Sequence, residues 1–281
     1  MQWNYYSNIQ EFASKANTIL FQQEAENNLP LGLLNRLVKS NKEENALCAL
    51  IERDNEVLAS FLMTPPHHLI ISVAEGAPTD KIIALAVREL IDSPYSIPSV
   101  IGDRVVATKF ASEWANTTGK NLSISMEQGV YRLDKVNDIE ESEGELTLAQ
   151  TEDLELLMDW LFAFIHDTGI MPVSKAKAEK MMIDKIANKT MFMWKVNGKA
   201  VSMTAIGRET TNGAVVNHVY TPDSERGKGY ASSIVKKVSE IILKDKEFCT
   251  LYTDLSNPTS NKIYMAIGYK PIAESIVIEF S

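Results

Sequence analysis

The sequence predicts a mixed α/β fold, an α+β mixed sheet, built as two similar domains that each have a mostly antiparallel central sheet flanked by helices. Segments with strand-like and helix-like hydrophobic periodicity alternate along the 281 residues. The order of segments in the first half recurs in the second, since Ala46 and Met191 are 145 residues apart and Val57 and Val201 are 144 apart. A near-constant offset is typical of a diverged internal repeat.

The clearest break in composition is the acidic stretch DKVNDIEESEGE at residues 134–145. It has few side chains to bury, which is typical of a linker. We therefore expect a first domain at residues 1–134, a linker at 135–144 and a second domain at 145–281.

Composition and charge limit the possible function classes. Hydrophobic residues make up 45% of the chain and charged residues 23%, as in folded globular proteins, and the net charge of -9 disfavours nucleic-acid binding. The two cysteines lie in apolar runs and are expected to be free thiols in a reducing compartment. The N-terminus does not read as a signal peptide, and no apolar stretch is long enough to span a bilayer. We expect a cytoplasmic protein without a membrane partner.

In the first half, the hydrophobic pattern predicts a strand hairpin around Asp54-Asn55, followed by alternating strands and helices. The predicted strands are 46–52, 56–63, 67–75, 99–103, 121–128 and 129–136, and the helices are 79–91 and 104–118.

The second half is predicted in the same way. Asn197-Gly198 is a strong signal for a type I′ hairpin, and Asn257-Pro258 is typical of a helix start. The predicted strands are 145–150, 191–196, 199–207, 213–221, 248–254 and those within 269–280, and the helices are 151–168, 174–187, 230–243 and 257–267.

The most informative stretch is the turn Arg226-Gly227-Lys228-Gly229-Tyr230-Ala231, between a strand and an amphipathic helix. The first N–H groups of a helix lack internal partners and the helix dipole is positive there, so such a turn can bind phosphate. Glycines let the backbone approach a ligand closely. The spacing matches neither the nucleotide P-loop nor the dinucleotide fingerprint, and glycine-rich turns of this kind often bind nothing.

A second motif lies downstream, where Asn257-Pro258-Thr259-Ser260-Asn261-Lys262-Ile263-Tyr264 is followed by Gly268-Tyr269. The two motifs together resemble the acetyl-CoA-binding pattern of the GNAT family of N-acetyltransferases, Arg/Gln-x-x-Gly-x-Gly/Ala followed by an Asn-x-x-(Ala/Ser)-x-x-x-Tyr helix. The resemblance covers about residues 145–281, and it is much weaker before residue 134.

The resemblance implies where acetyl-CoA, the expected co-substrate, would bind. The backbone of Val219 and Thr221 would pair with the pantetheine arm, the amides from Arg226 to Ser232 would hold the pyrophosphate, and Asn257 would hydrogen-bond the pantetheine. The full set of expected cofactor-binding residues is Val219, Tyr220, Thr221, Arg226, Gly227, Lys228, Gly229, Tyr230, Ala231, Ser232, Asn257 and Ser260.

Catalysis is also read from the resemblance. Tyr264 would protonate the leaving thiolate as a general acid, and a backbone N–H near Tyr220 would polarise the thioester carbonyl. The alternatives are that Tyr264 is a core aromatic and that Asn257 is a helix cap. The candidates for a general base are His218, Glu209 and Asp254, and the sequence does not choose among them.

The first half lacks the motif, because Glu75 and Asp80 flank the corresponding turn and would repel a pyrophosphate. We expect a degenerate GNAT-like domain there. The whole chain is expected to be an acetyl-CoA-dependent N-acetyltransferase acting on a primary amine of a small molecule or peptide, without a metal. His67-His68 has no partner at metal-ligand spacing.

Two alternatives remain open for the function, and the oligomeric state is not predicted. The enzyme would use a longer acyl-CoA or acylate an amino acid, or the protein would be an acyl-CoA sensor without turnover.

Overall fold

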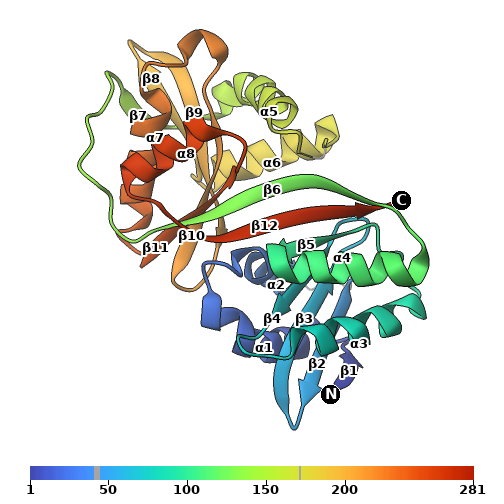
Figure 1. Ribbon diagram of the computed structural model, residues 1–281. Helices are drawn as coiled ribbons and strands as arrows, with labels where there is room; N and C mark the ends of the chain where they lie inside the picture. Colours follow the sequence, from blue (N-terminus) through green and yellow to red (C-terminus); the bar gives the residue numbers. More distant parts are fainter. Residues whose placement is uncertain (41–44, 171) are drawn as a thin grey trace. The chain divides into compact units, whose positions relative to one another are not determined.

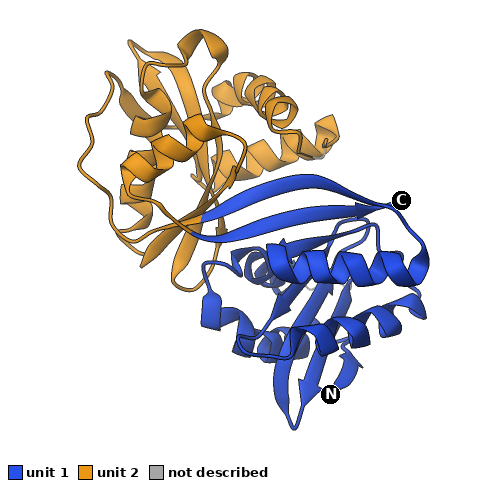
Figure 2. Ribbon diagram, viewed as in Figure 1, with its two compact units in different colours: residues 1–130, 272–281 blue, residues 131–271 orange. Residues whose placement is uncertain are grey.

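The computed structural model describes residues 1–40, 45–170 and 172–281, and its helices and strands are drawn in Figure 1. The chain forms two compact units (Figure 2). Unit 1 comprises Met1–Val130 and Ile272–Ser281, and unit 2 comprises Tyr131–Pro271.

Unit 1 is a sheet with helices on both faces. Its strands follow the order β1-β2-β3-β4-β5-β12, in which only β4 and β5 are a parallel pair. Its elements are β1 (Gln2–Tyr5), α1 (Ile9–Leu20), α2 (Asn28–Ser40), β2 (Leu47–Arg53), β3 (Glu56–Met63), β4 (Leu69–Val73), α3 (Thr79–Ile91), β5 (Ser99–Asp103), α4 (Arg104–Thr118) and most of β12 (Lys270–Phe280).

The sheet of unit 1 has two apolar cores because alternate residues of a strand point to opposite faces. On β2, Ala49 and Ile51 pack in one core with α3 and α4, and Leu50 packs in the other with α1 and α2. This alternation is what fixes the register of the strands.

Unit 2 repeats the arrangement, with the strand order β6-β11-β10-β9-β8-β7, in which β10 and β11 are parallel and β7 to β10 are antiparallel neighbours. One core joins the sheet to α7 and α8, and the other joins it to α5 and α6. Its elements are the end of β6 (Leu122–Leu133), β7 (Glu145–Leu148), α5 (Leu154–Thr168), α6 (Lys175–Ala187), β8 (Met191–Val196), β9 (Lys199–Glu209), β10 (Gly213–Tyr220), α7 (Tyr230–Ile242), β11 (Phe248–Asp254) and α8 (Pro258–Ile267).

The order of elements confirms the predicted fold class. Apart from short 3₁₀ turns, each half of the chain runs strand, helix, helix, three strands, helix, strand, helix, strand. Both predicted hairpin turns have the positive φ angles that a type I′ turn requires, 53° and 69° at Asp54-Asn55 and 50° and 79° at Asn197-Gly198. The repeat also includes β1, α1 and α2, for which the sequence analysis assigned no elements.

The structure differs from the sequence prediction at the ends of the two halves. Residues 122–133 form one continuous strand instead of two, and residues 270–280 form one strand where more than one was predicted. The last strand of the chain pairs with β5, for example Ile276 with Gly102, so residues 272–281 belong to unit 1 and not to the expected second domain. The neighbour of β11 is in turn β6, the last strand of the first half.

The acidic stretch expected to be a linker lies within unit 2 and packs along α7. The buried Lys236 side chain donates to the Ile139 carbonyl at 2.9 Å and pairs with Glu141 at 2.9 Å. The Ser142 amide donates to Ser233 Oγ at 2.8 Å, and Trp194 Nε1 donates to the Glu143 carbonyl at 2.9 Å. The ion pair of Glu141 and these hydrogen bonds therefore hold the acidic stretch against α7 and β8.

Candidate functional site

Strands β10 and β11 of unit 2 diverge. They pair in parallel at only three positions, of which Val215 with Thr250 is the last. β10 continues to Tyr220 and β11 to Asp254. Beyond Val215 and Thr250 the two strands therefore no longer pair with each other along their facing edges. Strand edges need hydrogen-bond partners, and an extended ligand arm supplies them.

A β-bulge shapes β10 at the start of this opening. Asn217 pairs with Ala205 and Tyr220 with Met203, so β10 has one more residue than β9 in this interval. His218 has a φ of 51°, which is uncommon for a residue other than glycine. A bulge locally disrupts the ladder, and here the disruption falls at His218 and Val219, next to Tyr220.

The predicted phosphate-binding turn follows β10 and a 3₁₀ turn at Asp223–Glu225. Gly227 and Gly229 have φ angles of 79° and 82°, a conformation that glycine adopts without strain. Gly229 is the N-cap of α7, and among the described residues no side chain caps this helix. The amides of Tyr230, Ala231 and Ser232, all half-buried, therefore open the helix with their N–H groups available.

Charged side chains of the turn are paired within the chain. Lys228 Nζ lies 2.8 Å from Glu225, which also binds Lys199 at 2.9 Å, and Glu225 raises the pKa of Lys228. The positive charge of Lys228 is thus largely compensated. The groups of this turn that can attract an anion are therefore its backbone N–H groups and the positive end of the helix dipole.

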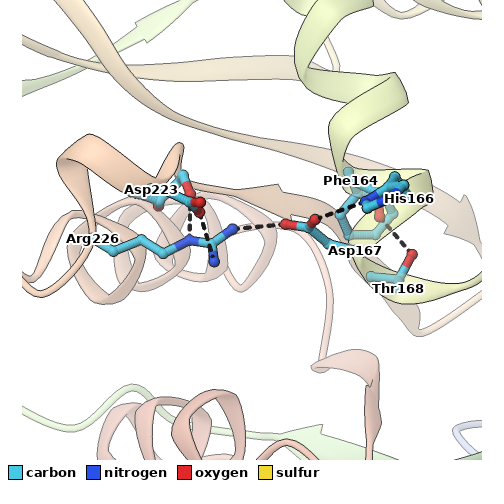
Figure 3. Close-up of polar contacts among 7 residues, drawn as sticks. Phe164, His166, Asp167, Thr168, Asp223 and Arg226 are labelled. Atoms are coloured by element: carbon cyan, nitrogen blue, oxygen red, sulfur yellow. Dashed lines mark hydrogen bonds and ion pairs between the residues drawn. The ribbon is translucent and has the colours of Figure 1, made fainter.

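Arg226 links the turn to the end of α5 (Figure 3). Its guanidinium pairs with Asp167 and Asp223, each at 2.8 Å, and its Nε donates to the Thr221 carbonyl at 2.9 Å. The hydrogen bond from Arg226 holds the pKa of Asp167 below its usual value. One lone pair of the Thr221 carbonyl is thereby used, and the second remains for a ligand.

Helix α8 begins with the predicted asparagine. Asn257 is exposed, and its side-chain oxygen accepts from the Ser260 amide at 3.1 Å, which makes it an N-cap. Only the side-chain oxygen of Asn257 takes part in the cap, and its side-chain NH₂ group does not. Ser260 is half-buried in the first turn of the same helix.

Tyr264 lies in the core formed with α7 and α8 and is 9% exposed. Its ring meets Tyr269 edge-on, with 6.1 Å between centroids. Burial raises the pKa of Tyr264 to about 12, so the phenol keeps its proton at neutral pH. Tyr264 is therefore a core aromatic residue, which was one of the two alternatives from the sequence. It also keeps the proton that a general acid needs.

The three candidate bases differ in surroundings. Burial, with the charges of Lys185 and Arg208, lowers the pKa of His218 to about 3, which makes it a weak base. Glu209 is exposed and lies 3.8 Å from Lys246. Asp254 closes its own loop by accepting from the amide and hydroxyl of Ser256, both at 2.7 Å.

The corresponding turn of unit 1 is different. β4 and β5 also pair at only three positions, and Gly76 has a φ of 73°. However, the first turn of α3 contains Asp80, whose carboxylate pairs with Lys109 at 2.5 Å. An acid paired with Lys109 therefore lies at the helix start of unit 1, whereas in the described part of the chain no side chain caps the corresponding helix of unit 2.

Sequence reasoning missed two features of the site. The bulge at His218 has no sequence signal that we recognise. Lys185 and Arg208 lie close enough to His218 to shift its pKa, although they are far apart in the sequence. No cluster of metal-ligating side chains occurs in residues 1–40, 45–170 and 172–281, and no helix there is long and apolar enough to cross a membrane.

Comparisons with known proteins agree with this geometry. Residues 196–278 match the family model described as FR47-like protein. A search of curated proteins gives no match.

Solved structures match the chain over nearly its whole length. A GNAT-family acetyltransferase from Colwellia psychrerythraea is 11% identical with a TM-score of 0.62, covering 100% of this chain and 99% of that chain. A GCN5-related N-acetyltransferase from Sphaerobacter thermophilus is 14% identical with a TM-score of 0.65, covering 99% and 95%. A tandem GNAT protein from the clavulanic acid biosynthesis pathway is 9% identical with a TM-score of 0.58, covering 100% and 98%.

These likenesses extend the resemblance first carried by Arg226–Ala231 and Asn257–Tyr264, both of which lie inside the FR47-like match. The chain therefore has the GNAT acetyltransferase fold in its tandem form.

Proposed function

We propose that the protein is an acetyl-CoA-dependent N-acetyltransferase that acetylates a primary amine, with one active site in unit 2. The observation that carries the proposal is the opening between β10 and β11, which leads into the glycine turn at the start of α7. An extended, phosphate-bearing thioester fits both parts of this arrangement.

The residues present fit the co-substrate. The free edge of β10 at Val219 and Thr221 would pair with the pantetheine arm, and the amides from Arg226 to Ser232 would hold the pyrophosphate. Because the oxygen of Asn257 caps α8, its NH₂ group would be the one that contacts the pantetheine. Lys228 contributes little charge, since Glu225 already pairs with it.

The chemistry is a direct transfer. The amine nitrogen attacks the thioester carbonyl carbon, the carbon–sulfur bond breaks, and the sulfur leaves as a thiolate. A backbone N–H at the bulge near Tyr220 would stabilise the developing oxyanion. Tyr264, which holds its proton because burial raises its pKa to about 12, would protonate the sulfur.

We assign no side chain as the base that deprotonates the amine. His218 with a pKa near 3 holds a proton too weakly, and Glu209 and Asp254 are engaged elsewhere. Proton removal by ordered water, or entry of the amine in its neutral form, accounts for this step.

Unit 1 would not bind CoA at its corresponding turn, because the ion pair between Asp80 and Lys109 lies at the start of α3. A longer acyl-CoA as donor is a second candidate for the enzyme. An acyl-CoA sensor without turnover is a candidate from another class. The presence of both Asn257 and Tyr264 at the motif positions favours the enzyme over the sensor, because a protein that only binds acyl-CoA would not need both.

The experiment is release of free thiol from acetyl-CoA across a panel of primary amines, with product identified by mass spectrometry. Amine-dependent release and an acetylated amine are expected. Tight acetyl-CoA binding without release for any amine would support the sensor and contradict the enzyme. Faster release from a longer acyl-CoA with the same amine would identify the second candidate.

A further inference from the structure

Five elements of unit 2 place polar and aromatic side chains on the α5–α6 face of the opening between β10 and β11. His218 of β10 lies 5.8 Å from Phe164 of α5, measured between ring centroids. Lys185 of α6 and Arg208 of β9 both act electrostatically on His218. Tyr252 of β11 lies two residues past the last residue that pairs with β10. All five side chains are half-buried.

Arg208 occupies a bulge in β9, where Glu209 pairs with Ala214 and Gly207 with Val215. Its guanidinium carbon lies 5.2 Å from the centroid of the Tyr252 ring, so it reaches from β9 across to β11. Its Nε is buried without a hydrogen-bond partner, and no ion pair to it occurs in the described part of the chain. This cation is therefore held in place by an aromatic ring and not by an acid.

Lys185, near the end of α6, is the second cation. Its Nζ donates to the Ile206 carbonyl at 3.2 Å, and no carboxylate of the described residues pairs with it. Burial, followed by the charge of Arg208, lowers the pKa of Lys185 to about 8. Arg208 and Lys185 thus repel each other, and both are partly shielded from water.

The acids nearest in the chain are engaged elsewhere. Asp184 pairs with Lys180 at 2.7 Å on the exposed side of α6, and Asp167 pairs with Arg226. The exposed Glu209 carboxylate lies within 4 Å of Lys246, at 3.8 Å. His218 adds no third charge near neutral pH, since its pKa lies near 3.

Two half-buried cations without a counter-ion are costly, because desolvation and mutual repulsion both destabilise them. A bound anion removes both costs, and a guanidinium offers a carboxylate two parallel N–H donors. The cations flank the opening where the thioester carbonyl would lie.

We infer that the acceptor amine carries a carboxylate, which Arg208 and Lys185 bind while the amine points into the opening between β10 and β11. This inference rests on the proposed function, since it names the class of its second substrate. A free α-amino acid is the smallest molecule with both groups, and it serves as the probe.

The test compares acetylation of free α-amino acids with that of their α-carboxamides, which keep the amine and lose the charge. We expect a KM about tenfold or more lower for at least one amino acid than for its carboxamide, the scale of a charge-assisted hydrogen bond. Arg208→Gln and Lys185→Met should remove most of this difference while leaving the KM for acetyl-CoA unchanged. Arg208→Lys, which keeps the charge, should retain part of it.

The matched control is Lys177→Met, which removes an exposed lysine from the same helix. It should leave the preference intact, and thermal unfolding should show that all variants are folded. Equal KM values for amino acids and carboxamides, unchanged preference in both Arg208→Gln and Lys185→Met, or acetylation of neutral amines only would each overturn the inference. These results still show amine acetylation, whereas failure of the proposed function appears as no transfer to any amine.

Discussion

At the scale of single residues, the site contains two kinds of group. The conformation of some follows from the residue type alone, whereas the charge state and contacts of others depend on which side chains lie beside them. Gly227 and Gly229 were legible in the sequence because only glycine adopts their φ angles of 79° and 82° without strain. The engagement of Lys228 by Glu225 was not legible, since a spacing of three residues does not say which side chains meet. The conformation of the turn was thus predictable, and the pairing of its lysine was not.

Tyr264→Phe should lower kcat by about tenfold or more if the phenol protonates the leaving thiolate. The KM for acetyl-CoA should change little, because the ring remains in the core. Steady-state kinetics at saturating acetyl-CoA measures this. Since the pKa of Tyr264 is near 12, the wild-type rate should show no loss from its ionisation below about pH 11.

An unchanged kcat in Tyr264→Phe would mean that solvent protonates the thiolate. Tyr269→Phe is the matched control, since that ring packs edge-on against Tyr264 and its hydroxyl lies 2.8 Å from Ser239 Oγ. We expect it to affect stability more than kcat.

Lys185→Met should stabilise the fold at neutral pH. The pKa of Lys185 is about 8 in the folded chain and near 10.5 when unfolded, so below pH 8 both states are charged and the folded state carries the full cost of burial. Between pH 8 and 10.5 the unfolded state binds more protons, and wild-type stability rises with pH relative to the variant.

The advantage of Lys185→Met should therefore be largest below pH 8 and fade by about pH 10.5, as thermal unfolding at several pH values would measure. Lys177→Met should show no such window. A variant that is less stable than wild type at pH 7 would contradict the burial argument for Lys185.

At the scale of elements, most helices and strands could be predicted because their apolar spacing is regular. The hairpins at Asp54-Asn55 and Asn197-Gly198 and the helix start at Ser174 appear where predicted. Strand β6 was predicted as two pieces, because Gly129 interrupts its pattern, and the structure runs through that residue. The bulge at His218 and the early divergence of β10 from β11 depend on pairing between strands, which no local pattern records.

Helix α8 tests whether Asn257 is a cap, a ligand contact or both. Asn257→Ser keeps a side-chain oxygen that caps the helix, whereas Asn257→Ala loses it and should cost about 1 kcal/mol of stability. If the side-chain NH₂ also contacts the co-substrate, both variants should raise the dissociation constant of acetyl-CoA equally. Calorimetric binding together with denaturant unfolding separates these effects.

Unchanged acetyl-CoA affinity in Asn257→Ser would reduce Asn257 to a cap. Loss of affinity in Asn257→Ala alone would mean that the shape of α8, and not a direct contact, matters for binding.

At the scale of the whole molecule, the internal repeat was visible in the sequence. The sequence did not show that the last strand of each half of the chain pairs with strands of the other half. The offset between Ala46 and Met191 predicted two similar halves, and the order of elements agrees. A strand's apolar pattern tells which of its faces is buried and not which neighbour it pairs with. The sequence therefore could not show that residues 272–281 complete unit 1 by pairing with β5.

The same reasoning applies to the acidic segment at residues 135–144. Its composition predicted a linker between domains, and the structure adds that Glu141 has Lys236 and Lys237 within 2.9 Å and 2.8 Å. These two cations of α7 are thus paired within the chain and are not free to bind a phosphate. The asymmetry between the two units rests on the backbone turn of unit 2 and on Asp80 of unit 1.

The most direct test of this account is a calorimetric titration of the whole chain with acetyl-CoA, comparing wild type with Gly229→Asp and Gly229→Asn. Asn and Asp are similar in size and are both strained at the φ of 82°, so the pair differs mainly in charge. The account predicts one site per chain, kept with reduced affinity in Gly229→Asn and lost in Gly229→Asp. Two sites per chain, or equal affinity in wild type and Gly229→Asp, would contradict it.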